Sequence, residues 1–331
     1  MADYDEALNR IARADVGTVR RDEPLRPHAT WRIGGPADLW IEPHDAQHVV
    51  HFIRAVRADP VPFVVVGYGS NLLFDDAGLR GAVLMCGRRM ARFSSDGATV
   101  RAQAGVTVPR LARAVGRAGL TGLEHTIGIP GTLGGLVAMN GGSRRRSIGE
   151  VVRTVTVVTP DGRIETLPAE ACGFAYRTSR FQASGETIVE ATLELVPGDR
   201  ETIRRDMLDA LRSRRAKFPR REPNCGSVFK SEGDMYGRFG PPGKVIEDAG
   251  CKGWREGDAQ VSLKHANFIV NLGRASSADV LRLIRRVREA VHDRTGLWMP
   301  CEVKYVTPQG EVMSACLAVP ETRRPQPRRL P

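Results

Sequence analysis

Two glycine-rich segments carry the residues whose types and spacing could bind an anionic ligand. The first, Gly67-Tyr68-Gly69-Ser70-Asn71, ends a β-branched run, and the second, over 128–142, reads GIPGTLGGLVAMNGG. Glycine allows close approach of the backbone, and consecutive N–H groups can bind an anion without a charged side chain. Neither segment completes a Rossmann or P-loop motif. Together the two segments predict a cofactor with an extended diphosphate, held from two sides; two tight turns are the alternative.

Size and composition predict a folded protein of two or three domains. The chain has 331 residues, of which 41% are hydrophobic and 26% charged. It contains no apolar run long enough to span a membrane, and its acidic, amphipathic N-terminus does not resemble a signal peptide. We therefore expect a cytoplasmic protein. The six cysteines are scattered without Cys-x-x-Cys spacing, so neither a metal site nor a disulfide is predicted.

The charge balance indicates an anionic partner. The formal net charge is +11, with basic clusters over 144–146 and 212–221. Nucleic acid and a phosphate-rich small substrate are both candidates. Only 6% of the residues are aromatic, and none interleaves with these clusters as a stacking platform for bases would require.

Hydrophobic periodicity predicts an α+β protein rather than a regular βαβ repeat. A hairpin over 151–167 is centred on the Pro160-Asp161-Gly162 turn, and a domain boundary is expected near 218, where the composition changes. The expected helices cover 45–57, 108–119, 201–217, 243–250 and 277–293. The expected strands cover 61–66, 187–196, 226–230, 267–272 and 301–306.

Seven motifs occur in the order of one known family. They are TWRIGGPAD, GYGSNLLF, GLEHTIGIPGTLGGLVAMNGG, FAYRTSRF, NCGSVFK, DAGCKGWREGDAQVSLKHANFIVN and CEVKYV. With them, the chain resembles the UDP-N-acetylenolpyruvoylglucosamine reductase family, in its shorter type II form. The resemblance implies a two-part FAD-binding region of the vanillyl-alcohol-oxidase type and a C-terminal α+β substrate domain. It also implies that both glycine loops contact FAD.

The implied domains follow the chain. They are a helical lead-in over 1–24, an FAD-binding region over 25–217 with subdomains 25–88 and 89–217, a substrate domain over 218–316 and a disordered basic tail over 317–331. Within the substrate domain, residues 301–306 would return to the active site.

The implied activity is the reduction of UDP-N-acetylglucosamine enolpyruvate to UDP-N-acetylmuramate, for peptidoglycan synthesis. NADPH would reduce FAD, and hydride would then pass from flavin N5 to C3 of the enolpyruvyl group. Arg177 and Glu302 match the family positions that bind the substrate carboxylate and stabilise the developing enolate. Ser227 matches the residue that protonates C2.

The resemblance also implies the binding residues. The cofactor contacts expected for FAD are Gly67, Tyr68, Gly69, Ser70, Asn71, Leu72, Gly128, Ile129, Pro130, Gly131, Thr132, Gly134, Gly135, Asn140 and Ile188. The candidates for substrate binding are Tyr176, Lys217, Lys230, Lys244 and Asn267. We expect a monomer without nucleic-acid or membrane partners.

The chain departs from the family pattern at four places, two of which are Ser231-Glu232, where Asn-Pro is usual, and Cys225, where Ala or Ser is usual. Tyr68 replaces the usual middle glycine of the first loop, and three arginines, Arg144 to Arg146, follow the second loop. A positive φ at Tyr68 would be strained. Two rival hypotheses stay open at this point: another flavin oxidase of the same fold, and a basic nucleic-acid-binding protein.

Overall fold

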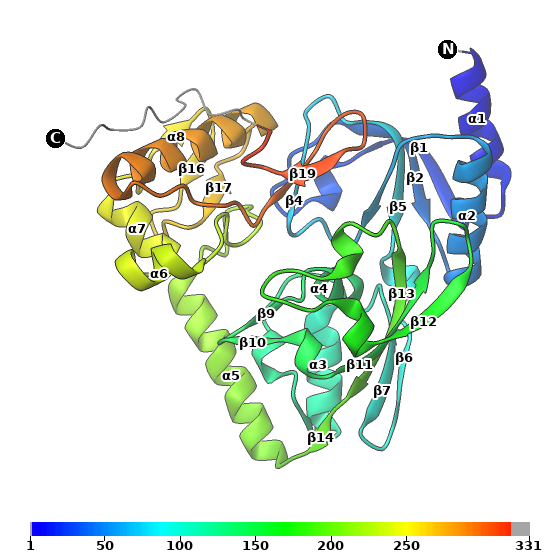
Figure 1. Cartoon of the computed structure of the whole chain (residues 1–331), viewed down its shortest axis with the longest axis horizontal. Helices are drawn as coiled ribbons and strands as arrows, with labels where there is room; N and C mark the ends of the chain where they lie inside the picture. The colour runs from blue at the N-terminus through cyan, green and yellow to red at the C-terminus, as the bar shows by residue number, and fades with distance from the viewer. Residues whose placement is uncertain (1, 319–331) are drawn as a thin grey trace.

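The computed structural model describes residues 2–318, and its N-terminal part is a four-stranded sheet with two helices (Figure 1). The elements are α1 (Ala2–Arg13), β1 (Thr18–Pro24), β2 (Pro36–Glu42), α2 (Ala46–Ala58), β3 (Phe63–Val66) and β5 (Leu79–Met85). The strand order is β1-β2-β5-β3, with β1 antiparallel to β2 and the other pairs parallel. Helix α2 begins after Asp45, whose carboxylate accepts from the His48 N–H and caps the helix.

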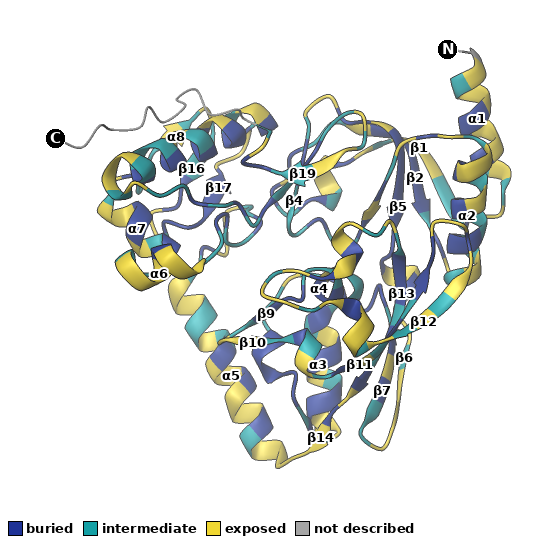
Figure 2. Cartoon of the chain, in the orientation of Figure 1, coloured by how far each residue is buried: buried dark blue, intermediate teal, exposed yellow. Residues whose placement is uncertain are grey.

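The middle part is a five-stranded antiparallel sheet in the order β12-β11-β13-β7-β6. Its strands are β6 (Phe93–Asp96), β7 (Thr99–Gln103), β11 (Val152–Val158), β12 (Ile164–Pro168) and β13 (Thr187–Glu194). Between β7 and β11 lie α3 (Val108–Arg117), β8 (Leu120–Thr121), η3 (Glu124–Thr126), α4 (Leu133–Ala138), β9 (Gly142–Ser143), β10 (Arg146–Ser147) and η4 (Ile148–Glu150). Strand β14 (Val196–Pro197) pairs with β8, and the long helix α5 (Arg200–Lys217) leads to the C-terminal part. The central strands β2, β5, β11 and β13 are largely buried, whereas the edge strands β1, β6 and β12 contain no buried residue (Figure 2).

The C-terminal part packs helices against a small antiparallel sheet, β15-β16-β17. Its elements are α6 (Gly233–Phe239), α7 (Pro242–Asp248), β15 (Arg255–Glu256), β16 (Ala259–Val261), β17 (Ile269–Asn271) and α8 (Ser277–Thr295). Trp31, from the N-terminal part, is buried in this core and donates its indole N–H to the Ile269 carbonyl at 2.7 Å. The N-terminal and C-terminal parts therefore share a core.

A second contact between the N-terminal and C-terminal parts is a three-stranded sheet. Strand β18 (Lys304–Val306) lies between β19 (Val312–Ser314) and β4 (Leu72–Phe74). Strand β4 directly follows the first glycine loop and pairs in parallel with β18, with Leu72 opposite Lys304. This pairing brings the segment that contains Glu302 back to the N-terminal part.

Most expected elements are confirmed within a few residues, because their hydrophobic pattern is local. The exception is the strand expected over 226–230, which is wrong. Only an isolated bridge between Phe229 and Cys301 forms there, and Gly226 has φ of +85°, which a strand does not tolerate. The disordered tail predicted over 317–331 lies mostly outside the described residues.

The expectation that no disulfide forms is also wrong. Cys301 and Cys316 form a disulfide with a Cα–Cα distance of 5.7 Å, while Cys86, Cys172, Cys225 and Cys251 are free and buried. The fold brings the two cysteines together through the β18–β19 hairpin, a contact that cysteine spacing alone does not predict. Within residues 2–318, no helix is long and apolar enough to cross a membrane.

Candidate active site

The two glycine loops lie against each other. A methyl group added to Gly67 would stand 2.4 Å from the Thr132 hydroxyl, and one added to Gly131 would stand 3.2 Å from the Ser70 hydroxyl. Thr132 also caps α4 by accepting from the Gly135 N–H. Loops from the two sheets thus meet in one place, as required of a site that holds one ligand from two sides.

The first loop has the free backbone donors that an anion site needs. Among residues 2–318, the N–H groups of Tyr68, Gly69, Ser70 and Asn71 have no hydrogen-bond acceptor. Buried backbone N–H groups are rarely left unpaired, and consecutive unpaired donors form a concave binding site for anions. This loop therefore fits a diphosphate.

The backbone geometry answers the question raised by Tyr68. The described non-glycine residues with positive φ do not include Tyr68, so its side chain imposes no left-handed strain. The left-handed position is Gly69, with φ of +55°, where an added Cβ would also stand 2.5 Å from the His28 carbonyl oxygen. Tyr68 lines a cavity of about 660 Å³ together with His28 and Trp40.

Hydrogen bonds join the first loop to the segment that carries Glu302, just before β18. The Asn71 side-chain amide donates to the Glu302 carbonyl at 3.1 Å, and the Lys304 N–H donates to the Asn71 carbonyl at 3.0 Å. Asn71 therefore connects the first glycine loop to the backbone of Glu302. A displacement of either segment would move the other.

Arg177 and Glu302 form an ion pair between distant parts of the chain. Arg177 Nε lies 2.8 Å from Glu302 Oε1, with side-chain exposures of 23% and 16%. The Nε–H does not point at the oxygen, so the contact is one of charges rather than an aligned hydrogen bond. Arg177 Nη2 donates to the Gly142 carbonyl at 3.3 Å.

The backbone of Arg177 is itself in a strained conformation. Its φ is 54°, a region that non-glycine residues adopt uncommonly and that is enriched at functional sites. Asn140 supports this turn by donating its amide to the Ala175 carbonyl at 2.9 Å, while its oxygen accepts from the Gly149 N–H. The second glycine loop therefore positions Arg177, through Asn140.

Burial dominates the electrostatics of Glu302. Loss of solvent raises the pKa of Glu302 above its usual value, although the positive charges of Arg177 and Lys230 oppose this shift. Burial also raises the pKa of the neighbouring Cys225 thiol, and the Glu302 carboxylate adds to that rise. The carboxyl group is thus held among cations in a partly desolvated place, an environment typical of functional carboxyl groups.

The loop that contains Ser227 is fixed against the same strand. The Glu302 N–H donates to the Val228 carbonyl at 2.8 Å. Asn267 uses both ends of its buried amide on the Phe229 backbone, at 2.9 and 3.0 Å. Ser227 therefore lies one residue from a main-chain contact with Glu302, and Asn267 positions this loop.

Sequence reasoning missed Lys304. Its side chain is half-buried, and burial, together with the charge of Lys230, lowers the pKa of Lys304. Its spacing of two residues from Glu302 was the available signal, because residues i and i+2 of a strand share a face. Lys230 and Lys304 thus add positive charge beside the ion pair.

The remaining candidates occupy varied positions. Tyr176 is exposed, and its ring lies 5.7 Å from the Arg177 guanidinium carbon. Lys244 forms an ion pair with Asp248 on α7. Lys217 is exposed at the end of α5, and Ile188 is buried in β13. Their predicted contacts with ligands stay predictions.

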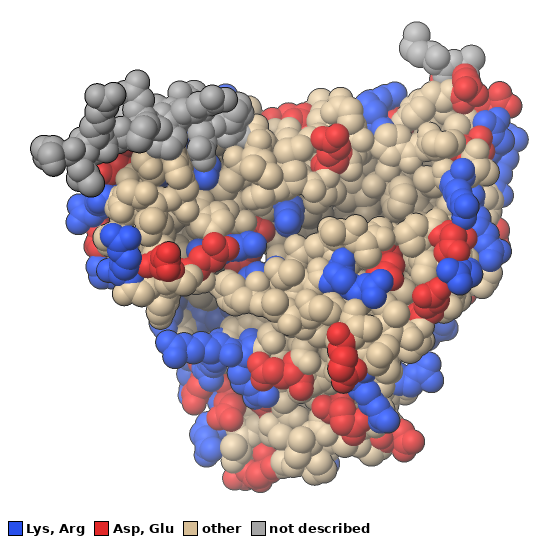
Figure 3. Space-filling model, viewed as in Figure 1, with Lys and Arg blue, Asp and Glu red and all other residues tan. Residues whose placement is uncertain are grey.

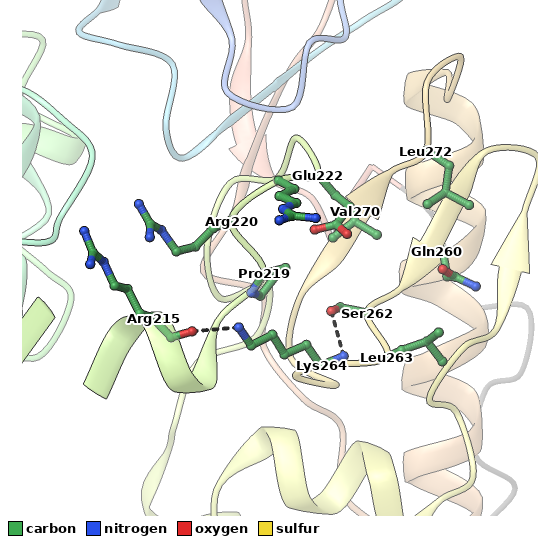
Figure 4. A pocket seen from close by; sticks show the side chains of 11 residues that line it. Arg215, Pro219, Arg220, Glu222, Gln260, Ser262, Leu263, Lys264, Val270 and Leu272 are labelled. Carbon is green, nitrogen blue, oxygen red and sulfur yellow. Dashed lines mark hydrogen bonds between the residues drawn. The ribbon is translucent and has the colours of Figure 1, made fainter. Parts of the chain in front are cut away.

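A further cavity of about 590 Å³ lies where α5 ends beside β16 and β17 (Figure 4). Lys264 donates to the Arg215 carbonyl at 2.7 Å, and the side chains of Arg215 and Arg220 point away from the sheet. The molecular surface is hollowed between the C-terminal part and the rest, with Lys and Arg side chains beside the hollow (Figure 3).

These features define a class of protein. Two glycine loops on two joined sheets face each other, and the α+β domain that follows returns a carboxylate to them. This arrangement is that of a flavin-dependent oxidoreductase. The FAD-binding domain family matches residues 37–168. Residues 218–306 match the family described as UDP-N-acetylenolpyruvoylglucosamine reductase, C-terminal domain.

Similarity to whole proteins narrows this class. The chain is 46% identical to UDP-N-acetylenolpyruvoylglucosamine reductase 1 of Corynebacterium glutamicum, over 88% of this chain and 87% of that one. It is 44% identical to reductase 2 of Symbiobacterium thermophilum, over 92% and 97%. The crystal structure of the Thermus caldophilus reductase superposes with a TM-score of 0.72 at 33% identity, over 87% and 98%. The chain belongs to the UDP-N-acetylenolpyruvoylglucosamine reductase family, which confirms the resemblance, the α+β flavoprotein fold and the oxidoreductase class.

Proposed function

We propose that this enzyme uses NADPH and FAD to reduce UDP-N-acetylglucosamine enolpyruvate to UDP-N-acetylmuramate, a step of peptidoglycan synthesis. The ion pair between Arg177 and Glu302, 2.8 Å apart, carries the proposal. It places a fixed cation and a buried carboxyl group beside both glycine loops. The names of the relatives supply the substrate.

The glycine loops would hold the FAD diphosphate. The free N–H groups of residues 68–71 are its proposed donors, with the loop around Gly131 closing the other side. When bound, FAD supplies the hydride for the reduction. The protein's own residues then have to bind the substrate, stabilise developing negative charge and deliver a proton.

Arg177 would bind the enolpyruvyl carboxylate and stabilise the negative charge that develops there. A guanidinium suits a carboxylate because it offers parallel hydrogen bonds and stays charged. Glu302 keeps the guanidinium in place, and Lys230 and Lys304 lower the electrostatic cost of a second anion nearby. Removal of one such donor typically costs about 10²–10³ in rate.

Ser227 would donate the proton to C2. The Val228–Glu302 main-chain contact and Asn267 hold its loop in place. A hydroxyl group is a weak acid, so this role depends on the neighbouring cations, which favour its deprotonated form.

The decisive experiment follows NADPH oxidation by the purified flavoprotein with and without the enolpyruvyl nucleotide. We expect rapid oxidation that depends on this substrate, and formation of UDP-N-acetylmuramate detected by mass spectrometry. Protein that carries flavin but oxidises NADPH at the same rate without the substrate would contradict the proposal.

The Ser227→Ala variant separates the two half-reactions. We expect flavin reduction by NADPH at the wild-type rate and a loss of at least about 10² in enolpyruvyl reduction. Ser95→Ala, at an exposed position on the edge strand β6, is the matched control and should change neither step. Near-normal turnover by Ser227→Ala would refute the assignment of the proton donor.

A further inference from the structure

The tip of the β9–β10 hairpin carries two arginines in a strained conformation. Arg144 and Arg145 form the two-residue turn between Ser143 and Arg146, with φ of 56° and 62°. Turns with positive φ at both positions favour Asn and Gly, because a larger L-residue is strained there. The hairpin thus holds two arginines where local stability favours other residues.

The base of this hairpin is fixed to the active site. The Gly142 carbonyl accepts from Arg177 Nη2 at 3.3 Å, and the Ser143 hydroxyl donates to the His125 carbonyl at 2.5 Å. A Cβ added to Gly142 would meet the Arg146 carbonyl oxygen at 1.9 Å, so the two short strands lie close together. The tip therefore stands at a defined place, two residues beyond the contact with Arg177.

The charges at the tip are not neutralised by acidic side chains among the described residues. Within residues 2–318, neither Arg144 nor Arg145 forms an ion pair or a side-chain hydrogen bond, and both are exposed. The adjacent Arg146 is already paired with Glu150 at 3.1 Å. Two uncompensated guanidinium groups on a fixed hairpin beside the site favour an anionic ligand.

We propose that the Arg144–Arg145 tip binds a phosphate group of a nucleotide whose reacting end lies at Arg177. Two extended residues span about 7 Å, and an arginine side chain adds to this reach, so the tip meets a part of the ligand distant from the reacting carbon. A guanidinium binds phosphate through parallel charge-assisted hydrogen bonds. The strained turn then has a functional reason.

This inference rests on the proposed function, which brings two nucleotides to the site. NADPH carries a 2′-phosphate, and the UDP-sugar carries a diphosphate. The shared chemistry is a nucleotide phosphate, and separate probes distinguish its two sources. The probes are 2′,5′-ADP, which has the 2′-phosphate, and UDP, which has the diphosphate.

The test measures the affinity of each probe for the flavin-loaded enzyme by calorimetry. The variant Arg144→Asn/Arg145→Gly removes both charges and places in the turn the residues that its backbone favours, so the hairpin should keep its shape. We expect at least a tenfold loss of affinity for one or both probes, because a hydrogen bond to a charged group is worth about a factor of ten or more. A loss confined to 2′,5′-ADP assigns the tip to the NADPH phosphate, and a loss confined to UDP assigns it to the diphosphate.

A control separates local binding from overall charge. Arg204→Gln/Arg205→Gln removes the same charge from exposed positions on α5. This variant should keep both affinities within twofold. Equal losses in the two variants, or unchanged affinities in the tip variant, would overturn the inference.

A kinetic readout adds an independent check. If the tip binds the 2′-phosphate, the ratio of kcat/KM for NADPH over NADH falls about tenfold in the tip variant, while kcat/KM for NADH is unchanged. The calorimetric test needs no turnover. An enzyme that fails to reduce the enolpyruvyl nucleotide, yet loses probe affinity in the tip variant, would refute the proposed function and leave this inference standing.

Discussion

Replacing Gly69 with alanine tests whether the first glycine loop is built as its geometry indicates. Gly69 has φ of +55°, and an added Cβ would stand 2.5 Å from the His28 carbonyl oxygen and 3.0 Å from Ala29 Cα. The left-handed conformation costs an L-residue about 1–2 kcal/mol. The close backbone contact requires a shift of the loop, which typically costs another 1–3 kcal/mol.

The combined cost of about 2–5 kcal/mol can appear in two ways. If the loop keeps its shape, the free energy of unfolding of the apoprotein falls by this amount. If the loop moves, its N–H groups lose their alignment, and FAD affinity falls by about tenfold for each 1.4 kcal/mol. The assay therefore has to measure both urea unfolding and the FAD dissociation constant, and their losses should sum to the predicted range.

Two neighbouring substitutions serve as controls. Gly131→Ala brings a Cβ no closer than 3.2 Å to the Ser70 hydroxyl, which can rotate away, so we expect a small loss. Tyr68→Gly should not tighten FAD binding, because Tyr68 has no positive φ to relieve. A Gly69→Ala enzyme with wild-type stability and wild-type FAD affinity would refute this account of the loop.

Three further predictions concern other parts of the molecule. Asn267→Leu should destabilise the protein by about 2 kcal/mol, because two hydrogen bonds to the Phe229 backbone are lost. It should also lower kcat with little change in FAD affinity. Urea unfolding and flavin titration measure these effects. Burial lowers the pKa of His125 to about 4, and among residues 2–318 neither ring nitrogen has a hydrogen-bond partner. In the unfolded chain His125 has an ordinary pKa near 6.5, so the unfolded state binds more protons than the folded state between pH 7 and pH 5. The free energy of unfolding should therefore fall by about 2 kcal/mol from pH 7 to pH 5 because of this residue. The His125→Leu variant should lack this part of the pH dependence. Alkylation of the unreduced, denatured protein should label four cysteines and leave Cys301 and Cys316 unlabelled; labelling of all six would exclude the disulfide.

Elements with local signals were predictable from the sequence. Helix α2 was expected from the apolar spacing after Asp45, and the β11–β12 hairpin from alternation around Pro160-Asp161-Gly162. In both cases the residues that decide the structure lie within a few positions of one another. The two glycine loops were likewise visible as segments, although their mutual contact was not.

The geometry of the site depends on long-range contacts, which local patterns do not contain. The parallel pairing of β4 with β18 joins distant segments of the chain, and it places Lys304, which is half-buried, opposite Leu72. The segment over 226–230 has the composition of a strand, but Gly226 and the single Phe229–Cys301 bridge leave it a loop. The Cys301–Cys316 disulfide has the same origin, since it follows from the turn between β18 and β19.

The side chains that we propose as catalytic are positioned by the same segments that are proposed to hold the cofactor. Asn140, in the second glycine loop, supports the strained turn of Arg177, and Asn71, in the first loop, binds the backbone of Glu302. The Arg177–Glu302 ion pair then closes the connection between the two loops. Because each contact fixes a different end of the pair, ordering of the loops by a bound diphosphate would also order the two groups that we propose to act on the substrate. Binding of the cofactor and positioning of the proposed catalytic pair would then be coupled through two asparagine side chains, rather than through the glycine backbone alone.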